Sequence, residues 1–244
     1  MELHRHLGQN GPMPLCFDLD GTLGLFGGGF LLLREALGEV WGEQPDEAEL
    51  GRCQGSTDWE IVDQMYRARH GAPIPDADYA AYDRACLARF EATFHPEGRA
   101  HTAFQGLITG MARLVDLGHR VWLVSGNTPS VLAFKARVLG VDPRIPRLGS
   151  LPGLDRADLI RRALQGCPGP HLYVGDRPHD RLAAERAGVP FLGVGSLVPG
   201  NHPILDPGAE AEHLVRAVAT MLNPGLAPGF PPVPGPCAPP PGRP

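Results

Sequence analysis

The sequence has little of what marks secreted or membrane proteins. Its five cysteines form no CxxC pair, lie far apart and come to an odd number, which indicates neither a disulfide framework nor a zinc knuckle. No run of about 18 apolar residues is long enough to span a bilayer. Residues 1–13 lack the apolar segment of a signal peptide. We therefore expect a soluble cytoplasmic protein.

The chain also lacks an excess of basic residues. Its 22 Lys and Arg residues are scattered and are outnumbered by 27 Asp and Glu, so the formal net charge is −5. Such a balance creates no positive field to attract nucleic acid, and we expect a small-molecule partner instead. The 244 residues, 43% of them hydrophobic, are enough for one α/β core and a smaller second domain. The sequence does not indicate the oligomeric state.

Short apolar runs that end in turn residues recur along the chain and indicate buried strands. These runs are residues 14–18, 120–127, 171–176 and 189–195. Helical stretches, each closed by a glycine, occupy residues 128–140, 155–166 and 177–188. An amphipathic segment at 101–119 precedes the second strand and is predicted to be a helix that covers the sheet. The pattern predicts an α/β fold, a Rossmann-like parallel sheet sandwiched by helices.

The stretch from residue 26 to 99 interrupts this alternation. It contains three segments with helical periodicity and no convincing strand, so we predict an inserted all-helical cap domain. Residues 1–25 and 100–222 would then form the catalytic core. Residues 223–244 are mostly Pro, Gly and Ala and are predicted to be a disordered tail. The alternative for this tail is a Pro-rich ligand for an aromatic groove.

Three acidic residues are expected at one edge of the sheet. Asp18 and Asp20 are two positions apart at the end of a strand and so share a face. Asp176 ends another strand, and ligands of open α/β sheets gather at the carboxyl ends of the strands. Mutual repulsion of these carboxylates would be offset by Mg²⁺, which prefers oxygen ligands. Asp180, one helical turn later, is expected to hold the Asp176 side chain in place. The alternative is that Asp180 only interacts favourably with the dipole of the following helix.

The segment Ser125-Gly126-Asn127 ends the strand at 120–124 and directly precedes a predicted helix. The amide groups at a helix N-terminus suit anions, and the Ser125 hydroxyl could donate to a phosphate oxygen. Gly126 would allow close approach of the backbone. A plain helix-capping segment is the alternative interpretation.

These segments resemble the four motifs of the haloacid dehalogenase-like hydrolase superfamily. DLDGTL at 18–23, Ser125 at a strand end, a later basic residue and GDRPHD at 175–180 occur in the family's order, and the similarity covers about residues 14–222. The resemblance implies that Asp18 is the nucleophile and forms an aspartyl-phosphate intermediate. It also implies that Asp20 protonates the leaving oxygen and then activates water.

The resemblance further implies a set of binding residues. Mg²⁺ would be bound by the Asp18 side chain, the Asp20 carbonyl and Asp176. The expected phosphate-binding residues are Thr22, Ser125, Gly126, Asn127 and Arg156. The third motif departs from the family, whose phosphate-binding residue there is usually Lys. Arg156, at the start of a predicted helix, is the preferred match, and Lys135 is the alternative.

The helical insert resembles the cap that many phosphatases of this superfamily close over the active site. In GSTDW at 55–59, Ser56 and Thr57 are candidate substrate contacts, with Thr57 or Asp58 as a helix N-cap the equally supported alternative. Residues 27–29 and 95–99 are predicted hinges. His95, His171 and His179 show no ligand spacing and are expected to be surface or packed residues.

The function that the resemblance implies is Mg²⁺-dependent hydrolysis of a small phosphorylated metabolite, similar to the phosphoglycolate phosphatase group. A phosphomutase of the same superfamily shares every motif named here and stays open. A catalytically silent binding module is a further alternative, because a fold does not by itself imply a function. A dehalogenase is disfavoured because that branch lacks the second aspartate, here Asp20. The sequence does not identify the substrate.

Overall fold

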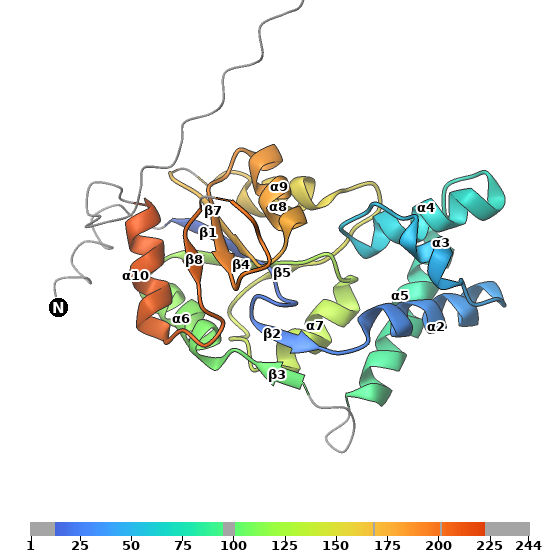
Figure 1. Ribbon diagram of the computed structural model, residues 1–244, viewed down its shortest axis with the longest axis horizontal. Helices are drawn as coiled ribbons and strands as arrows, with labels where there is room; N and C mark the ends of the chain where they lie inside the picture. Colours follow the sequence, from blue (N-terminus) through green and yellow to red (C-terminus); the bar gives the residue numbers. More distant parts are fainter. Residues whose placement is uncertain (1–12, 95–100, 168, 201, 223–244) are drawn as a thin grey trace, which may run out of the picture.

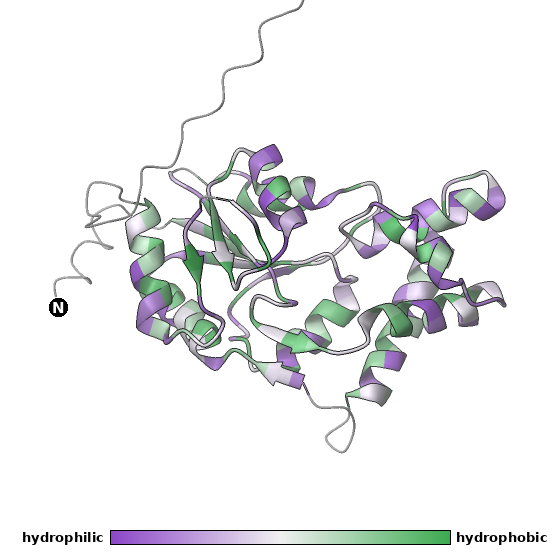
Figure 2. Cartoon of the chain, in the orientation of Figure 1, coloured by the Kyte–Doolittle hydropathy of each residue, from purple (hydrophilic) through white to green (hydrophobic). Residues whose placement is uncertain are grey.

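A six-stranded parallel sheet forms the centre of the core (Figure 1). The computed structural model describes residues 13–94, 101–167, 169–200 and 202–222. In spatial order, the strands are β5 (Arg147–Leu148), β4 (Arg120–Val124), β1 (Pro14–Phe17), β6 (Leu172–Gly175), β7 (Phe191–Val194) and β8 (Ile204–Leu205). Every residue of β1, β6 and β7 is buried, as expected for strands covered on both faces. In Figure 2 these strands are mostly hydrophobic.

The order of the strands brings the sequence motifs together. β1 lies between β4 and β6, with Phe17 paired to Leu123 on one side and to Val174 on the other. The carboxyl ends of these three strands therefore meet at one edge of the sheet. Asp18 follows β1, Ser125 follows β4 and Asp176 follows β6, so all three residues lie at this edge.

Helices cover both faces of the sheet, which confirms the predicted Rossmann-like α/β sandwich. The core helices are α6 (Gln105–Asp116), α7 (Pro129–Val138), α8 (Arg156–Leu164), α9 (Pro178–Ala187) and α10 (Ala211–Leu222). Leu107 of α6 and Leu214 of α10 belong to one hydrophobic cluster, whereas Ile160 of α8 and Ala184 of α9 belong to another. The two clusters occupy opposite faces of the sheet.

Four further helices form a lobe at one side of the core (Figure 1). They are α2 (Gly29–Trp41), α3 (Glu47–Gly51), α4 (Asp58–His70) and α5 (Asp76–Thr93). Their buried side chains form a separate hydrophobic cluster, which Val131 and Phe134 of α7 join from the core. All four helices lie within the predicted insert, and the division into core, cap and tail stays a prediction. The tail and the hinge at 95–99 lie outside the described residues.

Several short elements differ from the sequence-based expectation. Residues 101–119 were expected to be helical throughout, but β3 (His101–Ala103) precedes α6 and pairs antiparallel with β2 (Gly24–Phe26). The two-residue strands β5 and β8, and the helix α10, had no predicted counterpart. Each of these strands has two residues, too few to give a recognisable pattern, and each is held by pairing to its neighbour in the sheet. Among the described residues, no helix combines the length and hydropathy needed to cross a membrane.

Candidate active site

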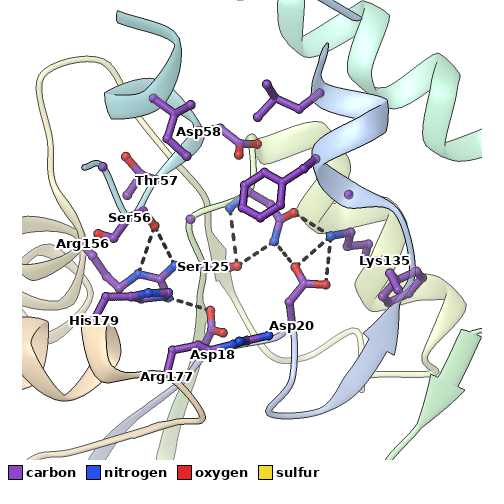
Figure 3. Close-up of a pocket in the computed structure, with 18 of the residues that line it drawn as sticks. Asp18, Asp20, Ser56, Thr57, Asp58, Ser125, Lys135, Arg156, Arg177 and His179 are labelled. Carbon is purple, nitrogen blue, oxygen red and sulfur yellow. Dashed lines mark hydrogen bonds and ion pairs between the residues drawn. The ribbon is translucent and has the colours of Figure 1, made fainter. Parts of the chain in front are cut away.

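A cavity of about 590 Å³ lies between the carboxyl edge of the sheet and the helical lobe. Its core side includes Asp18, Asp20 and Ser125, and its cap side includes Phe30 and Ile61. Figure 3 shows the polar side chains of the core and the 56–58 loop of the cap facing this space. The sheet thus supplies charged groups to the cavity, and the cap supplies much of its apolar wall.

Asp18 is the most deeply placed carboxylate of the cavity. Its backbone N–H donates to the Val174 carbonyl at 2.9 Å, which continues the pairing of β1 with β6. Its side chain is 3% exposed and accepts a hydrogen bond from Nη1 of Arg156 at 2.9 Å. Burial raises the pKa of Asp18 to about 8, and the nearby Arg156 charge opposes part of this rise. Asp18 is therefore costly to ionise without a further positive charge.

Three buried carboxylates lie close enough to bind one cation. Oxygen atoms of Asp18, Asp176 and Asp180 all lie within 4.8 Å of one another. Burial, followed by the charge of Asp180, raises the pKa of Asp176 to about 6. Gly21 makes room for this cluster, since it has a φ of +82° and a Cβ there would collide with the Asp176 carboxylate. An all-oxygen set of this kind suits Mg²⁺.

Asp180 supports the cluster from the first turn of α9. Its Oδ2 accepts from the backbone N–H of Arg177 at 3.0 Å, as a residue near a helix N-terminus often does. Its Oδ1 accepts from Nη1 of Arg156 at 2.6 Å and from the Tyr173 hydroxyl at 3.3 Å. The residue is completely buried. It therefore does more than interact with the helix dipole.

Thr22 lies beside the acidic cluster and does not line the cavity. Its side chain is fully buried, and its hydroxyl donates to Oδ1 of Asp176 at 3.2 Å. This contact orients a carboxylate of the proposed metal site. Phosphate binding by Thr22 was the expectation and stays a prediction.

Asp20 takes part in a second polar network, separate from the acidic cluster. Both of its carboxylate oxygens accept from Nζ of Lys135, at 2.9 and 2.8 Å. The Asn127 amide donates to Oδ2 of Asp20 at 2.6 Å and to Oγ of Ser125 at 2.8 Å. The Asp20 side chain is 37% exposed and faces the cavity. Ser125, Asn127 and Asp20 thus form one hydrogen-bonded network at the carboxyl edge of the sheet.

The loop before α4 lies directly on the core. The Ser56 carbonyl accepts from Nη2 of Arg156 at 2.7 Å, and the Asp58 N–H donates to the Gly126 carbonyl at 2.7 Å. Oδ2 of Asp58 accepts from the Thr128 N–H at 3.0 Å, and burial raises the pKa of Asp58 to about 6. Thr57 is the N-cap of α4 and accepts from the Glu60 N–H. The predicted capping role of Thr57 is confirmed, and the loop also lines the cavity.

Arg177 and His179 lie at the cavity but were not predicted as site residues. Arg177 lines it and places Nε 3.0 Å from Oδ2 of Asp176. His179 lines it as well, and burial lowers its pKa to about 4, so its imidazole is neutral at pH 7. Both follow Asp176 within the GDRPHD segment, which was the available signal. By contrast, Nε2 of His171 contacts the Cys167 carbonyl away from the cavity, and His95 lies outside the described residues.

Comparisons with solved structures show many similar chains, and the three described here have low sequence identity to this one. A predicted phosphoglycolate phosphatase from Haemophilus somnus 129PT is 18% identical with a TM-score of 0.55, covering 81% of this chain and 95% of that one. A protein described as a haloacid dehalogenase-like hydrolase from Bacteroides fragilis is 21% identical with a TM-score of 0.53, covering 81% and 98%. CbbY from Rhodobacter sphaeroides, solved in complex with phosphate, is 20% identical with a TM-score of 0.57, covering 80% and 94%.

The similarity is one of structure. No protein-family model and no curated protein sequence matches the chain. The solved structures share the parallel sheet and its flanking helices over most of their own length. The motif resemblance is therefore confirmed at the level of the fold, and this chain has the fold of the haloacid dehalogenase-like hydrolases.

Proposed function

We propose that this chain is a Mg²⁺-dependent phosphatase that hydrolyses a small phosphorylated metabolite through an aspartyl-phosphate on Asp18. The observation that carries the proposal is the pairing of two carboxylates with two cations in one cavity. Asp18 contacts Arg156 at 2.9 Å, and Asp20 contacts Lys135 at 2.8 Å. A buried carboxylate beside a guanidinium suits a nucleophile that attacks an anion, and a partly exposed carboxylate suits proton transfer.

The residues present fit a divalent cation. Asp18, Asp176 and Asp180 offer buried carboxylate oxygens within 4.8 Å of one another, and the raised pKa values of Asp18 and Asp176 show how unfavourable their charges are alone. Mg²⁺ would be held by Asp18 and Asp176, together with the Asp20 carbonyl. When bound, it would neutralise the charge of the phosphate and of the attacking carboxylate.

The chain's own residues would then perform two displacements at phosphorus. Asp18 forms a bond to phosphorus while the ester P–O bond breaks, and Asp20 gives its proton to the departing oxygen. In the second step, Asp20 takes a proton from the water that attacks the aspartyl-phosphate. Arg156, Ser125 and the amide groups of Gly126 and Asn127 would hold the phosphoryl oxygens. The cap loop at 56–58 would limit access of bulk water.

The test is phosphate release from p-nitrophenyl phosphate in the presence of Mg²⁺. The wild-type protein should release phosphate and the Asp18→Asn variant should not, because the amide is a poor nucleophile. Asp116→Asn, an exposed position on α6, is the matched control and should behave as the wild type. Equal release by wild type and Asp18→Asn would contradict the proposal. With a sugar phosphate as substrate, an isomeric sugar phosphate in place of free phosphate would indicate a phosphomutase.

A further inference from the structure

Lys135 is a buried cation in the last turn of α7. The residue is 3% exposed, although a lysine is almost never fully buried unless it is paired. Its ammonium lies 4.5 Å from the ring centre of Phe90 on α5 and 5.3 Å from that of Phe26 on β2. Aromatic faces attract a cation but offer it no hydrogen-bond acceptor of ordinary strength. The Lys135 ammonium therefore needs hydrogen-bond acceptors on the side that faces away from the two rings.

Such acceptors come from the proposed acid/base residue. Nζ of Lys135 donates to Oδ1 and Oδ2 of Asp20, at 2.9 and 2.8 Å, and to Oδ1 of Asn127 at 2.7 Å. An ammonium group has three N–H donors, and these three contacts match that number. Figure 3 shows the Lys135 side chain directed at the Asp20 carboxylate. Lys135 thus has no donor left for a phosphate oxygen in this arrangement.

Arg156 occupies the other half of the site. It contacts Asp18 and Asp180, and its contact with the Ser56 carbonyl brings it to the cavity wall. The two basic residues are therefore divided between the two carboxylates. This division favours Arg156 over Lys135 as the phosphate-binding residue, a choice that the order of motifs in the sequence leaves open because both residues precede Asp176.

We propose that Lys135 is a positioning residue for Asp20 and not a phosphate ligand. This inference rests on the proposed function. The position of Lys135 within α7, ten residues after Ser125, and the aromatic side chains around it restrict the movement of its ammonium. Two hydrogen bonds to one carboxylate fix the direction in which Asp20 faces the leaving oxygen of the ester. A correctly oriented acid is worth about 10²–10⁴-fold in rate when the leaving group needs a proton.

Two esters of similar shape separate positioning from phosphate binding. Phenyl phosphate has a leaving group that benefits from protonation, whereas p-nitrophenolate departs readily without it. We expect Lys135→Met to lower kcat/KM for phenyl phosphate by about 10²-fold, with a much smaller loss for p-nitrophenyl phosphate. The inhibition constant of inorganic phosphate should not change. Because kcat/KM reports the steps up to formation of the aspartyl-phosphate, the later attack of water does not obscure this comparison.

The matched control is Arg137→Met on the same helix, whose side chain is 70% exposed and which should match the wild type with both esters. Thermal unfolding shows whether each variant is folded, and Lys135→Gln replaces Lys135→Met if the latter is not. Equal losses with both esters and a raised inhibition constant for phosphate would make Lys135 a phosphate ligand and overturn the inference. Unchanged kinetics would also overturn it. Absence of phosphate release by the wild type would overturn the proposed function as well.

Discussion

Asp18 and Arg156, 138 positions apart in the sequence, are joined by a buried hydrogen bond of 2.9 Å, which Nη1 of Arg156 donates. The same guanidinium also reaches Asp180 and the Ser56 carbonyl. One residue therefore connects the proposed nucleophile, the buried Asp180 beside the proposed metal site and the loop at 56–58. A lysine has a single nitrogen and could not span these groups in the same way.

Replacing Arg156 should affect both stability and activity. Arg156→Met removes the guanidinium that donates to the buried carboxyl groups of Asp18 and Asp180, and we expect the free energy of unfolding to fall by about 3–5 kcal/mol. Arg156→Lys keeps the charge and should lose less stability and less activity. Urea unfolding and ester hydrolysis measure the two effects. Arg161→Met, an exposed position on α8, is the control, and an Arg156→Met variant as stable as this control would contradict the expectation.

Mg²⁺ should stabilise the folded chain. A ligand that binds only the folded state adds about 2.7 kcal/mol when present at 100 times its dissociation constant. We therefore expect Mg²⁺ to raise the midpoint of thermal unfolding and EDTA to reverse the rise. Asp176→Asn should abolish the response, because it removes one of the clustered carboxylates. Asp116→Asn should retain it. An undiminished Mg²⁺ response in Asp176→Asn would place the ion elsewhere.

The raised pKa of Asp18 predicts a pH dependence of stability without metal. The folded state keeps this proton up to about pH 8, whereas the unfolded chain releases it near pH 4. The stabilising contribution is therefore complete below about pH 4 and is lost as the pH rises through about 8. Between pH 6 and 8, the free energy of unfolding should fall by up to about 1.4 kcal/mol per pH unit.

Asp18→Asn removes this contribution and serves as the comparison. Asp58 and Asp176, with pKa values of about 6, contribute mainly below this window. Urea unfolding in EDTA at several pH values gives both curves. The wild type should lose stability relative to Asp18→Asn as the pH rises. Parallel curves for the two proteins would show that Asp18 ionises normally.

Gly126 should not tolerate a side chain. A Cβ there would lie 2.6 Å from Nη2 of Arg156 and closer still to the Ser56 carbonyl. We expect Gly126→Ala to displace the cap loop, to cost about 1–3 kcal/mol of stability and to lower kcat/KM for p-nitrophenyl phosphate. Gly51→Ala on α3 is the control, because a Cβ at that position meets nothing within 4 Å. A Gly126→Ala variant as stable and active as Gly51→Ala would show that the loop adapts freely.

Much of the core could be predicted from local sequence patterns. Buried strands such as β1 and β6 are apolar runs that end in turn residues, and the helices between them are amphipathic and closed by glycine. The strands could be predicted because a strand that is buried on both faces of a parallel sheet consists of a nearly continuous run of apolar residues. β5 and β8 left no such signal, since two residues form a strand only through their neighbours.

The sequence by itself determined that Asp18, Ser125 and Asp176 each follow a strand, and hence that they share one edge of a parallel sheet. Each of these strand ends can be recognised from the few residues immediately around it. Only the tertiary structure decided which cation contacts which of the two catalytic candidates: Arg156 contacts Asp18, and Lys135 contacts Asp20. These partners come from helices whose orientation depends on how they pack against the sheet and the cap, and the one-dimensional order of residues does not encode that angle in any local pattern.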